Sequence, residues 1–234
     1  ERELSLHFKI RTAANGKEAL RVLEEEEISL VVSDVMMPEM NGFELCRTIK
    51  SQLPFSHIPV ILLTALTDER QRIFGITGGA DDYIQKPFHT DYVKIKIIHL
   101  LQERQKLRER LLEKLRDNKL LLSEPEKVES IDDTFLRKFA EQIEAVYADP
   151  EYNVEKLSET LGLSRGHLHR KIKELTGTAP VEFLRTYRLN KATQLLRQNA
   201  YTVSEVAYRT GFSSPAYFSK CFKAVYGVTP TEYQ

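Results

Sequence analysis

The sequence is poor in cysteine and lacks any long apolar run. Cys46 and Cys221 are its only cysteines among 234 residues, and they have no partner spacing for zinc, so we expect reduced thiols. The longest apolar runs, such as 28–32 and 60–63, fall far short of the roughly 20 residues that span a bilayer. No membrane-spanning or secretory segment is therefore expected, and a reducing cytoplasm is the natural setting.

A net charge is lacking as well, because 34 Lys and Arg residues balance 34 Asp and Glu residues. The charges are unevenly distributed. Residues 1–91 hold 10 basic and 15 acidic residues, whereas residues 153–226 hold 12 basic and 5 acidic residues. The chain is long enough for two domains, and this asymmetry suggests that they have different tasks. The basic half has the electrostatic character of a protein that binds a phosphate backbone.

Two short helices around a tight turn are predicted within residues 202–230. The first helix has an apolar face, Gly211 ends it, and Pro215 opens the second helix after a serine that can cap it. The second helix directs Phe218 and Phe222 toward a core, with Ala224 and Val225 widening that face. Its basic side faces elsewhere, which describes a helix-turn-helix that fits the major groove. Periodicity alone leaves a plain αα-hairpin equally open.

A set of residues in this stretch decides between the two readings. It consists of Ala207, Gly211, Phe212, Tyr217, Phe218, Phe222, Lys223, Gly227 and Pro230. Their spacing resembles the AraC-type DNA-binding signature. That family carries two helix-turn-helix units joined by a long helix, and residues 154–177 and 180–199 fit the first unit and the joining helix. In the first unit we expect a helix through Thr160, a turn at Gly162 and a second helix over 164–175.

The resemblance implies which residues of the two second helices read bases in double-stranded DNA. In the first unit these are Gly166, His169 and Arg170, and in the second they are Pro215, Ala216, Tyr217 and Lys220. Other basic residues on the outward faces are Arg165, Lys173 and Lys223. Arg170 is the sharpest candidate, because a guanidinium can bond O6 and N7 of guanine together. Lys223 is expected to contact phosphate.

The amino-terminal half alternates short apolar runs with helical patterns. This alternation predicts an α/β fold, a doubly wound parallel sheet covered on both faces. The expected strands are 7–13, 28–33, 58–63 and 82–85, and the expected helices are 16–25, 42–50, 68–77 and one from residue 89 onward. Asp34, Thr64 and Lys86 follow consecutive strands, where chemistry gathers in parallel sheets. Each alone has a structural explanation, but together they predict an anion site with a nucleophile.

The segments around these residues read VVSDVMMPEMNGFEL, PVILLTAL and GADDYIQKPF. Over residues 1–100 the chain resembles the flavodoxin-like receiver domain of two-component response regulators. The resemblance implies that Asp34 accepts a phosphoryl group and that Thr64 and Lys86 contact its oxygens. The backbone carbonyl of Met36 would help Asp34 to hold Mg²⁺, and Tyr83 occupies the family's aromatic switch position.

One feature of receivers is missing. They begin with a buried central strand that ends in an acidic pair for Mg²⁺, whereas residues 1–16 resemble the end of the first helix and the second strand. We interpret this as a missing start rather than a degenerate receiver, with the first strand and the acidic pair absent from the chain. The magnesium site is then incomplete.

Three segments are predicted: a receiver over 1–100, a helical extension and linker over 101–132, and an AraC-type domain over 133–234. A leucine stripe begins at the end of the receiver and continues into the extension, and it is either a packing face or a short coiled coil. Its members are Leu100, Leu107, Leu111 and Leu115. The order of receiver, helical extension and AraC-type domain resembles free-standing regulators and also the carboxyl-terminal part of hybrid sensors. The segment SEPEKVESIDDTFLRK favours the hybrid type.

The leading hypothesis is a phosphorylation-controlled, sequence-specific transcription regulator that forms a homodimer when Asp34 is phosphorylated. Its kinase would be a separate histidine kinase or an upstream part of the same polypeptide, in which case this chain is the cytoplasmic part of a membrane-anchored sensor. One alternative is a constitutive DNA binder whose receiver serves only for dimerisation. The other is an aspartate-based phosphotransfer enzyme, which has less support because Met36 stands where a second aspartate would be needed.

Overall fold

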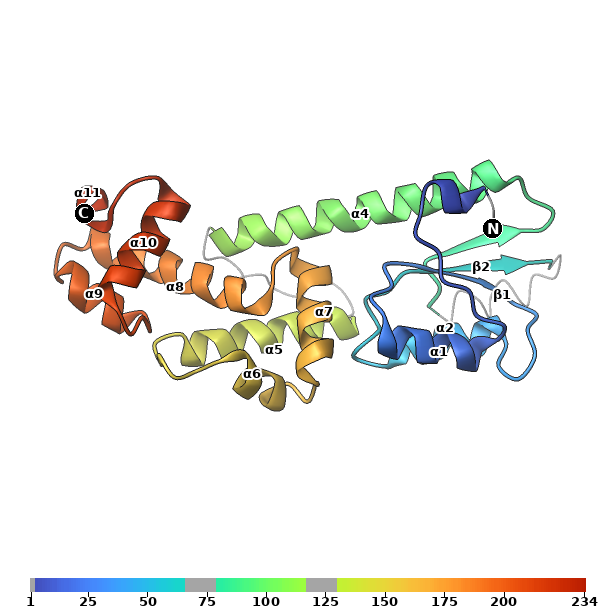
Figure 1. The fold of residues 1–234 in the computed structure, drawn as a ribbon, viewed down its shortest axis with the longest axis horizontal. Coiled ribbons are helices and arrows are strands. Elements are labelled where there is room, and N and C mark those ends of the chain that lie inside the picture. The colour runs from blue at the N-terminus through green and yellow to red at the C-terminus, as the bar shows by residue number, and fades with distance from the viewer. Residues whose placement is uncertain (1–2, 66–78, 117–129) are drawn as a thin grey trace. The chain divides into compact units, whose positions relative to one another are not determined.

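The computed structural model describes residues 3–65, 79–116 and 130–234, with the backbone alone over 111–116 (Figure 1). The chain divides into two compact units, Glu1–Leu107 and Arg108–Gln234. The helix expected over 68–77 lies outside the described residues. Within the described ranges, no helix is long and apolar enough to pass through a bilayer.

The first unit is a parallel sheet flanked by helices, as predicted. Its strands are β1 (Val31–Asp34), β2 (Val60–Thr64) and β3 (Asp82–Gln85), in the spatial order β1-β2-β3. The register pairs Asp34 with Leu63, and Thr64 with Gln85, so the carboxyl ends of all three strands lie at one edge. The described helices of this unit are η1 (Leu4–Leu6), α1 (Gly16–Glu25), α2 (Gly42–Ser51) and the first part of α4 (Thr90–Arg116).

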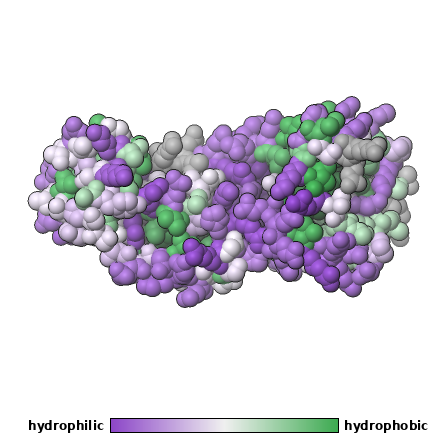
Figure 2. Space-filling model, in the orientation of Figure 1, coloured by the Kyte–Doolittle hydropathy of each residue, from purple (hydrophilic) through white to green (hydrophobic). Residues whose placement is uncertain are grey.

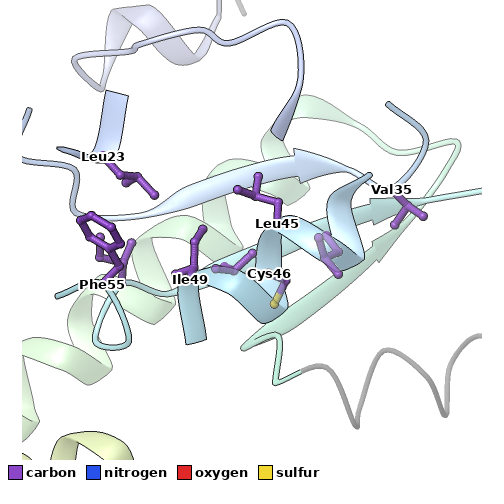
Figure 3. Packing of buried hydrophobic residues seen from close by; sticks show 9 residues of the cluster. Leu23, Val35, Leu45, Cys46, Ile49 and Phe55 are labelled. Atoms are coloured by element: carbon purple, nitrogen blue, oxygen red, sulfur yellow. The ribbon is translucent and has the colours of Figure 1, made fainter. Parts of the chain in front are cut away.

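Alternating residues of the strands pack into a separate core on each face of the sheet. Val60 and Leu62 of β2 face α1 and α2, where they pack with Leu45 and Ile49 (Figure 3). Ile61 and its neighbours on β3 face α4 on the other side. Period-two alternation along the strands therefore produces the three layers, with helices on both faces. Cys46 lies in the first of these cores as a buried thiol.

The strand expected over 7–13 is not formed. These residues have no regular secondary structure, and β1 is the edge of the sheet in the described part of the chain. A strand is stabilised by backbone hydrogen bonds to a neighbour, and the described sheet offers this segment no strand to pair with. Phe8 nevertheless packs on the core beneath α4, so the apolar pattern is used in packing without pairing.

The second unit is all-helical, and both predicted helix-turn-helix units are present. Its helices are α5 (Ile131–Val146), α6 (Val154–Thr160), α7 (Arg165–Thr176), α8 (Pro180–Arg197), α9 (Val203–Arg209), α10 (Pro215–Tyr226) and α11 (Pro230–Tyr233). The turns expected at Gly162 and Gly211 both place glycine in the left-handed region. Helix α5 begins two residues inside the predicted linker, because Ser130 and Asp133 form a capping box around its start.

Helix α8 contributes to two cores. Near its start, Phe183 stacks edge-on against Phe139 of α5, with ring centroids 4.7 Å apart. Toward its end, Leu189 and Leu196 pack with Phe218 and other residues of α9 and α10. One continuous helix therefore joins the two helix-turn-helix units. Ala224 and Val225 were expected in this second core, but both are exposed, and other residues of the last turns of α10 pack there instead.

Candidate functional sites

Asp34 and Lys86 meet at the carboxyl edge of the sheet. Asp34 is the last residue of β1, Lys86 follows β3, and the Lys86 ammonium forms an ion pair with the Asp34 carboxylate. The backbone N–H of Met36 donates a hydrogen bond to the other carboxylate oxygen at 3.1 Å. Both side chains of the pair are more than a third exposed, so the carboxylate is held from two sides and still open to solvent.

The strand register explains why residues 52 positions apart come together. The N–H of Val35 donates to the carbonyl of Leu63 at 3.0 Å, and the N–H of Lys86 donates to the carbonyl of Thr64 at 2.7 Å. These bonds carry the ladder one residue beyond each strand. Thr64 stands half-buried at the end of β2, between the two strands that carry the ion pair.

The electrostatics keep the Asp34 carboxyl ionised. Burial by itself would raise its pKa, but the hydrogen bonds from Lys86 and from the backbone of Met36 outweigh it, and the pKa lies below the usual value. The group is therefore a carboxylate at neutral pH. An ionised, solvent-accessible carboxylate next to an ammonium is able to act as a nucleophile toward an electrophile that carries negative charge.

Gly42 has a role at this site that sequence reasoning missed. It is the first residue of α2, and its N–H donates to the carbonyl of Val35 at 3.0 Å. A Cβ at this position would lie 2.2 Å from the carbonyl oxygen of Asp34. Only glycine lets α2 begin so close to the backbone that carries the carboxylate. The Asn41 capping box that starts α2 immediately before it was the available signal.

Two candidate magnesium ligands are present at this edge: the Asp34 carboxylate and the backbone carbonyl of Met36. Mg²⁺ prefers octahedral coordination by oxygen, usually with one or two carboxylates together with water and phosphate. Within the part of the chain that the structure describes, no group of three or more His, Cys, Asp or Glu residues could hold a metal ion.

Tyr83, the predicted switch residue, points inward from β3. Its ring packs on the core that contains Cys46, and its buried hydroxyl has no hydrogen-bond partner among the described residues. Burial, with a smaller contribution from Cys46, raises the pKa of Tyr83 to about 12, and burial likewise raises the pKa of the Cys46 thiol to about 11.

In the second unit, the predicted inner and outer faces of α7 are separated as expected. Leu168, Ile172 and Leu175 are buried. The exposed residues of the predicted DNA face are Arg165, Gly166, His169 and Lys173, while Arg170 is half-buried. Arg165 is also paired with Glu155 of α6, with a nitrogen-to-oxygen distance of 2.7 Å. Ser164 caps the helix, so its first residues are held in place at the turn.

Helix α10 shows the same division. Phe218 and Phe222 are fully buried, and Pro215 is half-buried at the helix start. The exposed residues of its predicted DNA face are Ala216, Tyr217, Lys220 and Lys223. Tyr217 is the bulkiest of them, and half of its surface is accessible. The residues proposed to read bases therefore lie on the solvent side of both helices.

Lys171 was not singled out by the sequence, although it lies in α7 between buried positions. Its side chain is 0% exposed, and its ammonium forms an ion pair with Asp132 of α5 at 2.6 Å. The same ammonium lies 5.1 Å from the centre of the Phe135 ring. A charge buried on one side of α7 and paired with the first turn of α5 fixes these two helices to one another.

Comparisons with known proteins agree with these two units. Residues 3–98 match the family model of the response regulator receiver domain, and residues 157–234 match that of a helix-turn-helix domain. The first part of the chain is thus a response regulator receiver domain. More narrowly, the chain combines this receiver domain with an AraC-type helix-turn-helix domain that follows it.

Three relatives illustrate the match. A histidine kinase of Formosa agariphila is 39% identical over 97% of this chain, which spans only 16% of that protein. The C-terminal domain of the response regulator yesN from Fusobacterium nucleatum is 33% identical, with 41% of this chain and 93% of that one covered and a TM-score of 0.40. The receiver domain of a histidine kinase from Syntrophus aciditrophicus is 39% identical, with 43% and 76% covered and a TM-score of 0.41.

Proposed function

We propose that the chain is the output part of a phosphorylation-controlled transcription regulator. Phosphoryl transfer to Asp34 favours a dimer of receivers, and the dimer places paired helix-turn-helix domains on double-stranded DNA. The observation that carries this proposal is the ionised Asp34, open to solvent beside Lys86, in a chain that also holds two DNA-binding units. The receiver supplies the signal and the helical domain supplies the response.

The proposed chemistry uses groups that are already in place. An oxygen of the Asp34 carboxylate attacks the phosphorus of a phosphodonor, the bond to the donor's leaving group breaks, and an aspartyl phosphate forms. Lys86 then exchanges its carboxylate partner for a phosphoryl oxygen, and the Thr64 hydroxyl donates to another. We also propose Mg²⁺ as a cofactor of this reaction. The Asp34 carboxylate and the Met36 carbonyl would supply two of its ligands.

Phosphorylation thus removes the charge pairing that now links β1 to the residue after β3. Lys86 is three residues from Tyr83, whose hydroxyl is buried without a partner among the described residues. We propose that the regrouping around the phosphoryl group changes the position of this ring and so reports phosphorylation to the surface of the receiver.

A surface for dimerisation is available on α4. Tyr92, Ile95 and Ile98 are spaced along one side of its first turns, and Ile95 is 62% exposed. Figure 2 shows apolar residues in green at the surface of this unit. A row of exposed apolar residues on a helix is typical of a protein interface. Leu107, 45% exposed, marks the competing interface along the leucine stripe, whose later members lie where no side chain is described.

The partner that phosphorylates Asp34 is proposed to be a histidine kinase. The Formosa relative is itself named a histidine kinase, and this chain aligns with 16% of it. That match supports the hybrid arrangement, in which the kinase and this chain belong to one polypeptide. A match of 37% identity over 125 residues to a Staphylococcus aureus protein named response regulator SaeR keeps a separate kinase as the other arrangement.

The test is chemical. The full-length protein is incubated with acetyl phosphate and Mg²⁺, and its mass is compared with that of Asp34→Asn and of the matched control Asp91→Asn, an acidic residue in the first turn of α4. One added phosphate is expected in the wild type and the control, and none in Asp34→Asn. Equal labelling of Asp34→Asn would show that the phosphoacceptor is another residue.

A further inference from the structure

A cleft of about 270 Å³ lies between the two helix-turn-helix units. Arginine and aromatic side chains from both units and from α8 line it, among them Tyr152, Arg165, Arg185, Arg188, Phe212 and Tyr217. Arg165 is the first residue of α7 and Tyr217 lies in the first turn of α10, so the cleft separates the starts of the two recognition helices. No acidic residue besides Glu155 lines it, and Arg165 pairs with that residue.

Hydrogen bonds and close backbone packing hold the inner wall of this cleft. Arg188 of α8 donates to the carbonyl of Tyr147 at 2.8 Å and to the carbonyl of Asp149 at 2.6 Å. Gly211 lies in the turn of the second helix-turn-helix unit, close to the Tyr147 carbonyl. A Cβ at this position would be 2.1 Å from that carbonyl oxygen. One arginine of the joining helix therefore bonds to the end of α5 and the residues after it, and the turn at Gly211 packs closely against the same place.

Arg185 lies one helical turn before Arg188 and remains more accessible, with 37% of its side chain exposed. It pairs with Glu182 on its own helix at 3.2 Å and lines the same cleft as Tyr217 of α10. The guanidinium has N–H donors beyond the one that Glu182 uses, and the Tyr217 hydroxyl, half accessible, can also donate. Both side chains can therefore donate to one anion in the cleft.

We propose that Arg185 and Tyr217 bind one backbone phosphate of DNA, at the point where a strand crosses between the two major grooves that α7 and α10 enter. The inference rests on the proposed DNA-binding function and assigns it a contact that the joining helix supplies. It also revises the role of Tyr217 from reading a base to positioning the backbone. This contact then fixes the register of both recognition helices relative to that phosphate.

The test compares Arg185→Gln and Tyr217→Phe with Arg197→Gln in the full-length protein. Arg197 is a matched control because it lies on the same helix and donates to a tyrosine hydroxyl, that of Tyr233, at 2.7 Å, but does not line the cleft. DNA is selected from a randomised library with the wild-type protein. Affinity is then measured across a range of salt concentrations, and the selection is repeated with each variant.

Arg185→Gln is expected to weaken binding by about tenfold, as for a lost charge-assisted hydrogen bond, with the preferred sequence unchanged. Its slope of log affinity against log salt should be about 0.9 smaller than that of the wild type, which is the value for one phosphate. Tyr217→Phe should weaken binding severalfold at unchanged slope, because it removes a donor and no charge. Arg197→Gln should behave like the wild type.

Two results would overturn the proposal. A changed preferred sequence in either cleft variant would mean that the residue reads a base, and a loss of affinity in Arg185→Gln with the wild-type slope would mean that the arginine only supports the fold. If the wild-type protein selects no DNA, the proposed function itself fails and this inference fails with it. Unfolding midpoints that match the wild type show that each variant is folded.

Discussion

Removing the carboxylate of Asp132 should destabilise the DNA-binding unit far more than its position at the edge of the predicted linker suggests. Its partner Lys171 is 0% exposed, with its ammonium 2.6 Å from the carboxylate, whereas the Asp132 side chain keeps 18% of its surface accessible. In Asp132→Ala the buried ammonium loses this carboxylate and keeps the Phe135 ring, 5.1 Å away, as an aromatic neighbour.

The magnitude follows from the asymmetry of buried ion pairs. Removing one partner of such a pair costs up to about 3–5 kcal/mol, because the remaining buried charge loses its counter-ion. The cation–π contact is present with and without Asp132, so it does not enter the difference between the two proteins. Asp132→Ala should therefore cost up to about 3–5 kcal/mol. Lys171→Met should cost less, because the remaining carboxylate is partly exposed and reaches water.

The assay is native-state hydrogen exchange of the α7 amides in the full-length protein, which reports the free energy of opening of this helix. The matched control is Asp133→Ala, the neighbouring acidic residue, which caps α5 and has no part in the buried pair. The control should cost only the loss of a cap, about 1 kcal/mol. If Asp132→Ala lowers the opening free energy of α7 no more than the control does, the ion pair does not fix α7 and the reasoning is refuted.

Three further variants test other parts of the account. Gly42→Ala should prevent phosphorylation, because its Cβ would lie 2.2 Å from the backbone carbonyl of the phosphoacceptor, whereas Gly166→Ala, which meets nothing within 4 Å, should label normally with acetyl phosphate. Arg170→Ala should relax the sequence preference at one or two base pairs in a randomised library, whereas Lys223→Ala should weaken all sequences alike and reduce the salt dependence. Ile95→Glu should abolish a phosphate-dependent dimer in analytical ultracentrifugation, and a persisting dimer would point to the leucine stripe instead.

Local signals in the sequence account for most of the helical architecture. Asparagine, serine and threonine caps begin helices where the pattern predicts, and Gly211 and Gly227 end them in the left-handed region. The pairing of Asp34 with Lys86 was also within reach of the sequence, because both follow strands of one parallel sheet and the ends of such strands share an edge.

The contacts that the sequence did not reveal join distant residues through side chains alone. Lys171 with Asp132 and Arg188 with the carbonyl of Tyr147 are separated by 39 and 41 positions, and neither pair follows from a helical or strand period. The strand predicted over residues 7–13 is not formed for the opposite reason: the local signal is present, but the long-range partner is not. Their strand-like pattern is local and genuine, but a strand also needs a neighbour, and the described sheet ends at β1.

The central claim is that phosphorylation of Asp34 controls DNA binding. The most direct test is the affinity of the full-length protein for its selected DNA, measured by mobility shift with and without acetyl phosphate, in the wild type and in Asp34→Asn. Joining two binding modules in a dimer should raise the apparent affinity of the phosphorylated wild type by roughly 10²- to 10⁴-fold. Asp34→Asn should show no increase. An affinity that acetyl phosphate leaves unchanged in the wild type, or raises equally in both proteins, would contradict the claim.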